Sequence, residues 1–109
     1  MSILRQGVVF VRKIRAGILQ ETDAGYLFQY DSDYLRRTDA SAVSLTLPLQ
    51  AEPYTSNILF PFFDGLIPEG WLLHVTCRNW KIDRSDRFGI LLVACNDCIG
   101  NVTIRGVNP

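Results

Sequence analysis

The sequence has few of the features that mark membrane proteins or nucleic-acid-binding proteins. It carries no net charge, with 11 Lys and Arg balanced by 11 Asp and Glu, so it lacks the excess positive charge on which non-specific binding to nucleic acids depends. The arginines are expected to form scattered surface ion pairs rather than a phosphate-binding patch. No apolar run approaches the ~20 residues that cross a bilayer, and the N-terminal residues lack the pattern of a signal peptide. We therefore expect a cytoplasmic protein with no direct contact to nucleic acid or membrane.

Recognisable catalytic machinery is also missing. The chain contains one histidine, no G-x-S-x-G motif, and no Gly-rich loop ending in the Lys and Ser or Thr of a P-loop. Two carboxylate pairs, Asp31 with Asp33 and Asp83 with Asp86, could act as general acids and bases, but turns and helix caps explain aspartate at these positions. We expect a protein that is not an enzyme and has no cofactor.

Three cysteines, an odd number, argue against a disulfide framework. His74 and Cys77 form an H-x2-C pair, and Cys95 and Cys98 form a C-x2-C pair, so the four side chains could together bind zinc. Both pairs, however, lie in apolar and apparently helical segments rather than in turns. We favour reduced thiols that serve as small apolar side chains, with a zinc-dependent module as the alternative.

The length and composition are those of one folded domain. The chain has 109 residues, of which 48% are apolar and 20% charged, and this length leaves no room for a second core. The first half shows the β-branched and alternating patterns of strands, with a short helical turn after Asp31. The predicted strands of this half cover residues 7–12, 14–20, 25–30 and 43–47.

The second half changes to a helical period. We predict one helix over residues 68–80, where Pro68 fits the first turn, and a second over residues 86–95, capped by Ser85. A last short strand over residues 101–105 places Val102 and Ile104 on one face. The expected fold class is α+β: a small antiparallel sheet curled into a partial barrel, with two main helices packed at one end.

The helix predicted over residues 68–80 has two unlike faces, because side chains turn by about 100° per residue. One face is expected to pack on the core and carries Leu72, Leu73, Thr76, Cys77 and Trp80. The opposite face carries Trp71, Val75 and Arg78, which leaves an indole pointing toward solvent beside a cation. Trp and Arg are enriched at binding hot spots, so this face favours an interface. Alternatively, Trp71 folds onto residues 60–67 and covers the core.

Four segments in order and spacing carry a resemblance to a known family: FQYDSDYL, SLTLPL, FPFFDGLIPEG and DRFGILLVACNDCIGNV. Together they resemble the N-terminal subdomain of the HipA family of serine/threonine kinase toxins, over nearly the whole chain. Cys95-Asn96-Asp97 departs from the usual G-x-D of the family at this turn. As a short separate chain it is similar to the small component of three-part HipBST toxin–antitoxin systems.

The resemblance implies a binding module that inhibits a HipT-type kinase toxin and joins a larger complex with a HipB-like DNA-binding protein. It places the contact with the kinase at Glu69 and Gly70 and implies that Trp71 inserts near the active-site cleft, with Val75 and Arg78 beside it. The alternative is a structural subunit of a split kinase that supports activity or assembly. A purely scaffolding subunit would more naturally present a broad apolar patch.

Overall fold

The computed structural model describes residues 2–67, 77–94 and 101–107. It confirms the α+β class. Strands β1 (Ile3–Val11), β2 (Ile14–Thr22), β3 (Gly25–Tyr30), β4 (Tyr54–Ser56) and β5 (Val102–Val107) form one antiparallel sheet in the order β4-β3-β2-β1-β5. The helices are α1 (Ser32–Leu35), α2 (Pro61–Asp64) and α4 (Arg87–Ala94), and residues 77–80 are also helical.

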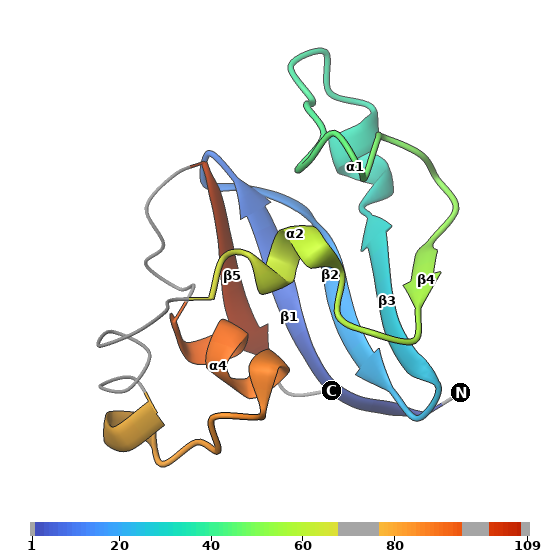
Figure 1. Cartoon of the computed structure of the whole chain (residues 1–109). Coiled ribbons are helices and arrows are strands. Elements are labelled where there is room, and N and C mark those ends of the chain that lie inside the picture. Colours follow the sequence, from blue (N-terminus) through green and yellow to red (C-terminus); the bar gives the residue numbers. More distant parts are fainter. Residues whose placement is uncertain (1, 68–76, 95–100, 108–109) are drawn as a thin grey trace.

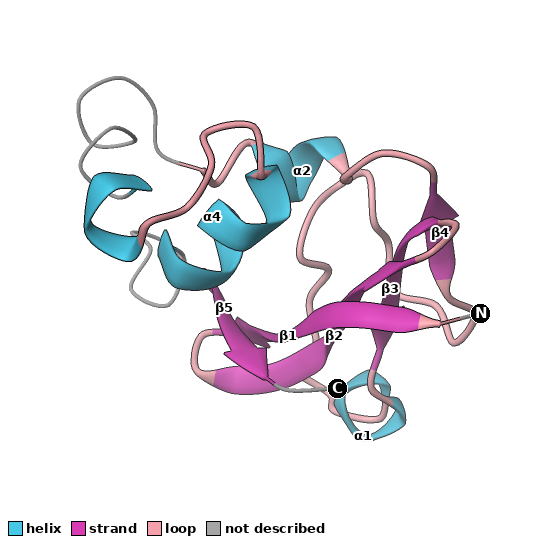
Figure 2. Ribbon diagram, turned by 90° about the horizontal axis from the view of Figure 1, so that it is seen from below, coloured by secondary structure: helices cyan, strands magenta, loops and turns pink. Residues whose placement is uncertain are grey.

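The sheet is open, so the expected curling does not go as far as closing a barrel: the outer described strands, β4 and β5, each pair on one side only. Helices α2 and α4 lie together over one face of the sheet, whereas α1 follows directly on the end of β3 (Figures 1 and 2). No helix in the described part of the chain is long and apolar enough to span a membrane.

Tight turns connect the first three strands, as the sequence predicts. The β1–β2 turn consists of Arg12 and Lys13, which have φ values of 51° and 68°. Two-residue hairpin turns of this kind need positive φ at both central residues and usually contain Asn-Gly. Here two cations adopt the left-handed backbone instead, at a cost in strain.

The core lies between the sheet and the helices α2 and α4. Its largest fully buried side chains come from both layers: Phe28, Phe63, Phe88, Leu19, Ile90, Leu91, Ile104 and Val9. The rings of Phe28 and Phe63 pack with centroids 5.3 Å apart, which joins β3 to α2. Val102 and Ile104 are both buried, so the expected alternation of the last strand is confirmed.

Helix α4 approaches the sheet over a pair of glycines. Gly7 of β1 and Gly106 of β5 are direct partners in the sheet, and Leu92 of α4 lies over both. A Cβ atom at Gly7 would stand 2.7 Å from Leu92 Cδ2, closer than carbon atoms can pack. Because Gly7 has no side chain, Leu92 can pack directly on the sheet, and this contact sets the distance between helix and sheet.

The prediction of a strand over residues 43–47 is wrong, and the hydroxyl of Tyr30 explains why. It accepts a hydrogen bond from the Val43 N–H and donates one to the Leu47 carbonyl. These main-chain groups are thereby satisfied by a side chain, and the segment folds into a tight turn closed by the Ser44–Leu47 bridge. The fourth strand is instead the short β4, which follows Pro53 and has too few residues to show alternation.

Replacing Tyr30 with Phe is expected to destabilise the domain. The change leaves the Val43 N–H and the Leu47 carbonyl without their buried partner, which should lower the free energy of unfolding by roughly 1–3 kcal/mol. Urea denaturation measures the loss. Tyr54→Phe is the matched control, because the Tyr54 hydroxyl donates to the Pro48 carbonyl at an exposed site, where water can replace it. Equal losses for the two variants would contradict this role of Tyr30.

Tyr30 should also make stability depend on alkaline pH. Burial raises the pKa of Tyr30 to about 12, above the ordinary value of about 10. Between these values the unfolded chain has lost the proton that the folded protein keeps, so the free energy of unfolding decreases as pH rises from about 10 to about 12. Below about pH 10 this group has no effect. Denaturation across this range should give a flatter pH dependence for Tyr30→Phe than for the wild type.

Candidate partner-binding surface

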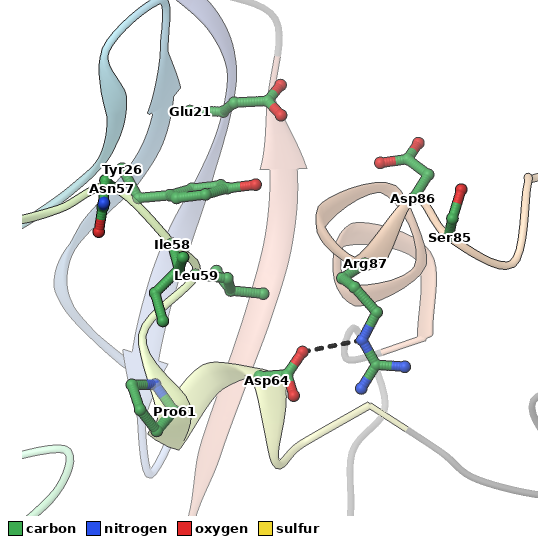
Figure 3. Close-up of a pocket in the computed structure, with 10 residues that line it drawn as sticks. All are labelled: Glu21, Tyr26, Asn57, Ile58, Leu59, Pro61, Asp64, Ser85, Asp86 and Arg87. Atoms are coloured by element: carbon green, nitrogen blue, oxygen red, sulfur yellow. Dashed lines mark hydrogen bonds and ion pairs between the residues drawn. The ribbon is translucent and has the colours of Figure 1, made fainter.

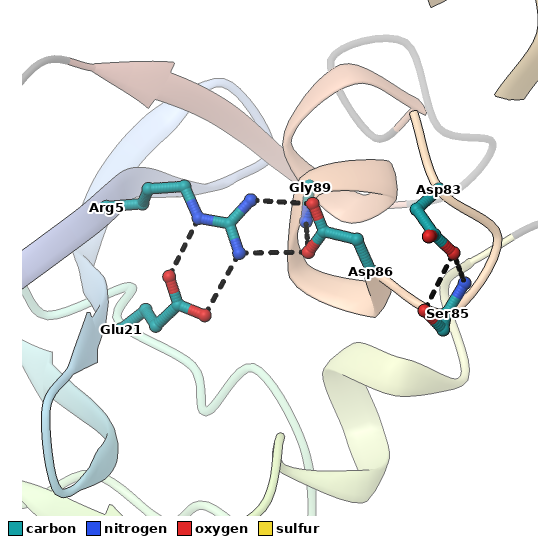
Figure 4. A network of polar contacts seen from close by, with 6 residues as sticks. All are labelled: Arg5, Glu21, Asp83, Ser85, Asp86 and Gly89. Atoms are coloured by element: carbon teal, nitrogen blue, oxygen red, sulfur yellow. Dashed lines mark hydrogen bonds and ion pairs between the residues drawn. The ribbon is translucent and has the colours of Figure 1, made fainter. Parts of the chain in front are cut away.

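A network centred on Arg5 fixes the start of helix α4 to the sheet (Figure 4). The Arg5 guanidinium donates to both oxygens of Glu21 at 2.7 and 3.0 Å, and to both oxygens of Asp86 at 2.9 Å. These hydrogen bonds hold the pKa of Asp86 below its ordinary value and raise that of Arg5, for which the bond to Glu21 is the largest cause. One side chain of β1 thus joins β2 to α4 through two bidentate ion pairs.

Asp86 also caps helix α4. Its Oδ1 accepts a hydrogen bond from the Gly89 N–H at 3.1 Å, so the prediction of Ser85 as the cap is wrong by one residue. The Ser85 hydroxyl and N–H instead donate to Asp83 Oδ1, and they lower the pKa of Asp83, the N–H first. Both aspartates therefore have the turn and cap roles expected from the sequence rather than a paired acid–base arrangement.

Replacing Gly89 with Ala should disrupt this junction. A Cβ atom there would lie 2.3 Å from Asp86 Oδ2 and 3.0 Å from Arg5 Nη1, so the carboxylate would have to leave its hydrogen bonds. We expect a loss of roughly 1–2 kcal/mol in the free energy of unfolding, although Ala normally favours a helix over Gly by about 1 kcal/mol. Gly106→Ala serves as control in chemical denaturation, since its Cβ would meet nothing closer than 3.5 Å. A stabilised Gly89→Ala variant would contradict the packing.

A shallow groove separates α2 from the start of α4 (Figure 3). It is lined by Glu21, Tyr26, Asn57, Ile58, Leu59, Pro61, Asp64, Ser85, Asp86 and Arg87. Across it, Arg87 donates to Asp64 Oδ1 at 2.8 Å, and burial raises the pKa of Tyr26. Glu21 and Asp86 are already held by Arg5 and Asp64 by Arg87, so their carboxylates act in structural contacts. The groove is best understood as the joint that positions the two helices.

Residues 77–80 form a helical turn that ends in an unusual way. The Ile82 N–H donates to the Cys77 carbonyl at 3.0 Å, and Lys81 between them has a φ of 55°. This is the arrangement of a Schellman motif, in which the left-handed position is usually glycine. Cys77 is buried and Ile82 packs against the core, so the turn is anchored on its inner side.

The expected division of this helix into two faces is only partly correct. Cys77 is buried as predicted, and Arg78 on the opposite face is exposed. Trp80, however, is 63% exposed and does not belong to the core. Trp80 is the last residue of the helical turn, and Lys81 turns the chain away directly after it, so the indole lies at the helix end, where the core does not cover it.

Four of the five residues predicted to contact a partner, Glu69, Gly70, Trp71 and Val75, lie outside the described residues. Arg78 is described: it is exposed and forms no ion pair with another described residue. Three of the four candidate zinc ligands, His74, Cys95 and Cys98, also lie outside the described residues. Cys77 is buried, as expected for a thiol that serves as a small apolar side chain.

Comparison with known proteins identifies the family. Residues 8–105 match the HipA N-terminal domain. This chain belongs to the HipA N-terminal domain family. A solved structure of the N-terminal domain of HipA toxin matches it with a TM-score of 0.73 and 31% identity, covering 99% of this chain and 97% of that one. An uncharacterized protein of Haemophilus influenzae is 37% identical over 104 residues, 95% of this chain and 94% of that protein.

Within this HipA N-terminal domain, sequence reasoning missed the residues that build the surface. Arg5 lies before the first strand predicted from the sequence, and only the fold places it in β1 and brings Asp86 to it. Lys81 gives no signal in composition or period, because its importance comes from a backbone conformation that its side chain disfavours. The sequence does show that most of the cations are arginines, but this becomes informative only once the carboxylate partner of each arginine is known.

Proposed function

We propose that this HipA N-terminal domain is an antitoxin of the HipS type, which binds a HipT-type serine/threonine kinase toxin and inhibits it. Its family membership across residues 8–105 is the observation that carries the proposal, because it relates the chain to the non-catalytic part of a kinase toxin. A HipB-like DNA-binding protein would complete the complex. The chain itself would be neither an enzyme nor a direct ligand of nucleic acid, and it would act in the cytoplasm.

The mechanism of inhibition would be steric. Trp71 would insert beside the nucleotide and substrate cleft of the kinase, with Glu69, Gly70 and Val75 in the same contact. The inserted side chain would keep the kinase from the closed arrangement that phosphoryl transfer requires. Arg78 supports this placement, because it is exposed and unpaired among the described residues at the end of the same predicted helix. A hydrogen-bonded Arg at the rim would add orientation to the aromatic anchor.

The competing proposal is a structural subunit that completes a split HipA-type kinase. The well-formed core favours neither proposal, since both need a folded domain. The exposed Trp80 beside cations favours a discrete binding contact over a broad apolar scaffold surface. The two proposals therefore differ in one measurable quantity, the direction in which this chain changes kinase activity.

Autophosphorylation of a HipT-type kinase toxin, measured with increasing amounts of this protein, tests the proposal. We expect the wild type to suppress the activity and Trp71→Ala to lose about 30-fold or more in affinity, as for a hot-spot residue worth about 2 kcal/mol. Leu45→Ala is the control, because Leu45 is fully exposed in the turn closed by the Ser44–Leu47 bridge and is not among the residues proposed to contact the kinase. Binding with unchanged or raised kinase activity would refute inhibition and establish the structural subunit.

A further inference from the structure

The cations of the described chain divide into two groups by their partners. Most are held by the protein itself: Arg5, Arg15, Arg36, Arg37 and Arg87 by carboxylates, Arg12 by the Asp39 carbonyl, and Arg105 over the Phe10 ring. Lys13, Arg78, Lys81 and Arg84 are exposed and have no such partner among the described residues. All but Lys13 lie within residues 78–84, so the free positive charge is concentrated in one short segment.

An exposed aromatic side chain lies within the same segment. Trp80, between Arg78 and Lys81, leaves 63% of its surface exposed, whereas the aromatic rings of Phe28, Phe63 and Phe88 are fully buried. The segment lies on the far side of α4 from the sheet, at the periphery of the molecule (Figure 1). Arg78, Trp80, Lys81 and Arg84, here called the 78–84 surface, thus present three exposed cations and an exposed indole in one short segment.

The backbone of Lys81 gives a second, independent observation. Its left-handed conformation, with a φ of 55°, suits glycine and strains any residue with a Cβ atom. The non-glycine residues with positive φ in the described chain are Arg12, Lys13 and Lys81, all cations. A lysine at this position therefore lowers stability while it adds charge to the 78–84 surface, which indicates that the charge is used.

We infer that the 78–84 surface docks onto an acidic, carboxylate-rich face of a partner protein. Charge complementarity favours such a face, because Arg78 and Arg84 can each form bidentate hydrogen bonds with carboxylates and Trp80 can bury a large area between them. Nucleic acid would share the attraction to cations, but the whole chain has no net charge to favour it. For the identity of the partner this inference rests on the proposed function: the acidic face belongs to the kinase, beside the site that takes Trp71.

The experiment is to reverse the charges and measure association with the same HipT-type kinase by surface plasmon resonance at low and high salt. The variant Arg78→Glu/Lys81→Glu/Arg84→Glu is expected to associate about tenfold more slowly than the wild type at low salt, with a smaller difference at high salt. Lys13→Glu is the matched control, because Lys13 is also unpaired among the described residues and left-handed but lies in the β1–β2 turn. It should leave the association rate unchanged.

Each result separates this inference from the proposed function. If the triple variant and Lys13→Glu associate like the wild type while Trp71→Ala still relieves inhibition, the docking surface is refuted and the antitoxin stands. If the wild type does not bind the kinase, the proposed function fails, and the assignment of the acidic face to that kinase fails with it. Binding of single-stranded DNA by the wild type but not by the triple variant would also overturn the acidic protein as partner.

A second pair of variants protects the experiment against misfolding of the triple variant. Lys81→Gly and Lys13→Gly should each raise the melting temperature, because glycine relieves the left-handed strain at both positions. Only Lys81→Gly should also slow association with the kinase. Equal association rates for these two stabilised variants and the wild type would mean that the Lys81 charge takes no part in docking.

Discussion

The Arg5 guanidinium is the contact on which the arrangement of this domain depends. Without it, the carboxylates of Glu21 and Asp86 would face each other in a half-buried site with no counter-charge. With it, the sheet and the first turn of α4 are joined by four hydrogen bonds. The joint fixes α4, and α4 in turn holds α2 through Arg87 and Asp64. The positions of both helices on the sheet therefore depend on one charged side chain of β1.

Local patterns in the sequence predicted the elements that are stabilised locally. The three-stranded meander follows from alternation and short turns, and α4 from its apolar run, so these were within reach of sequence reasoning. The segment 43–47 has the same alternation but became a turn, because the Tyr30 hydroxyl takes its main-chain groups. The local sequence pattern cannot indicate that the main chain of a segment will bond to a side chain of β3, which lies elsewhere in the sequence.

The sequence predicted only part of the candidate surface. Helical spacing placed Arg78 on an outer face, and the structure agrees. The same spacing placed Trp80 inward, but Trp80 is the last helical residue and 63% of its surface is exposed, so the face of a helix alone does not decide burial at its end. The concentration of unpaired charge in residues 78–84 could not be seen in advance, since it depends on which carboxylates the fold assigns to the other arginines.

The place of β1 in the sheet has a consequence for synthesis of the chain. Among the described strands β1 is translated first, yet its neighbours are β2 and the last of them, β5. While the chain is still on the ribosome, the hairpin can form but the other edge of β1 stays unpaired, with Val8 and Val9 beside open main-chain groups. Such an edge can pair with another nascent chain. Aggregation during translation would therefore begin at β1, a strand that is paired on both sides once folding is complete.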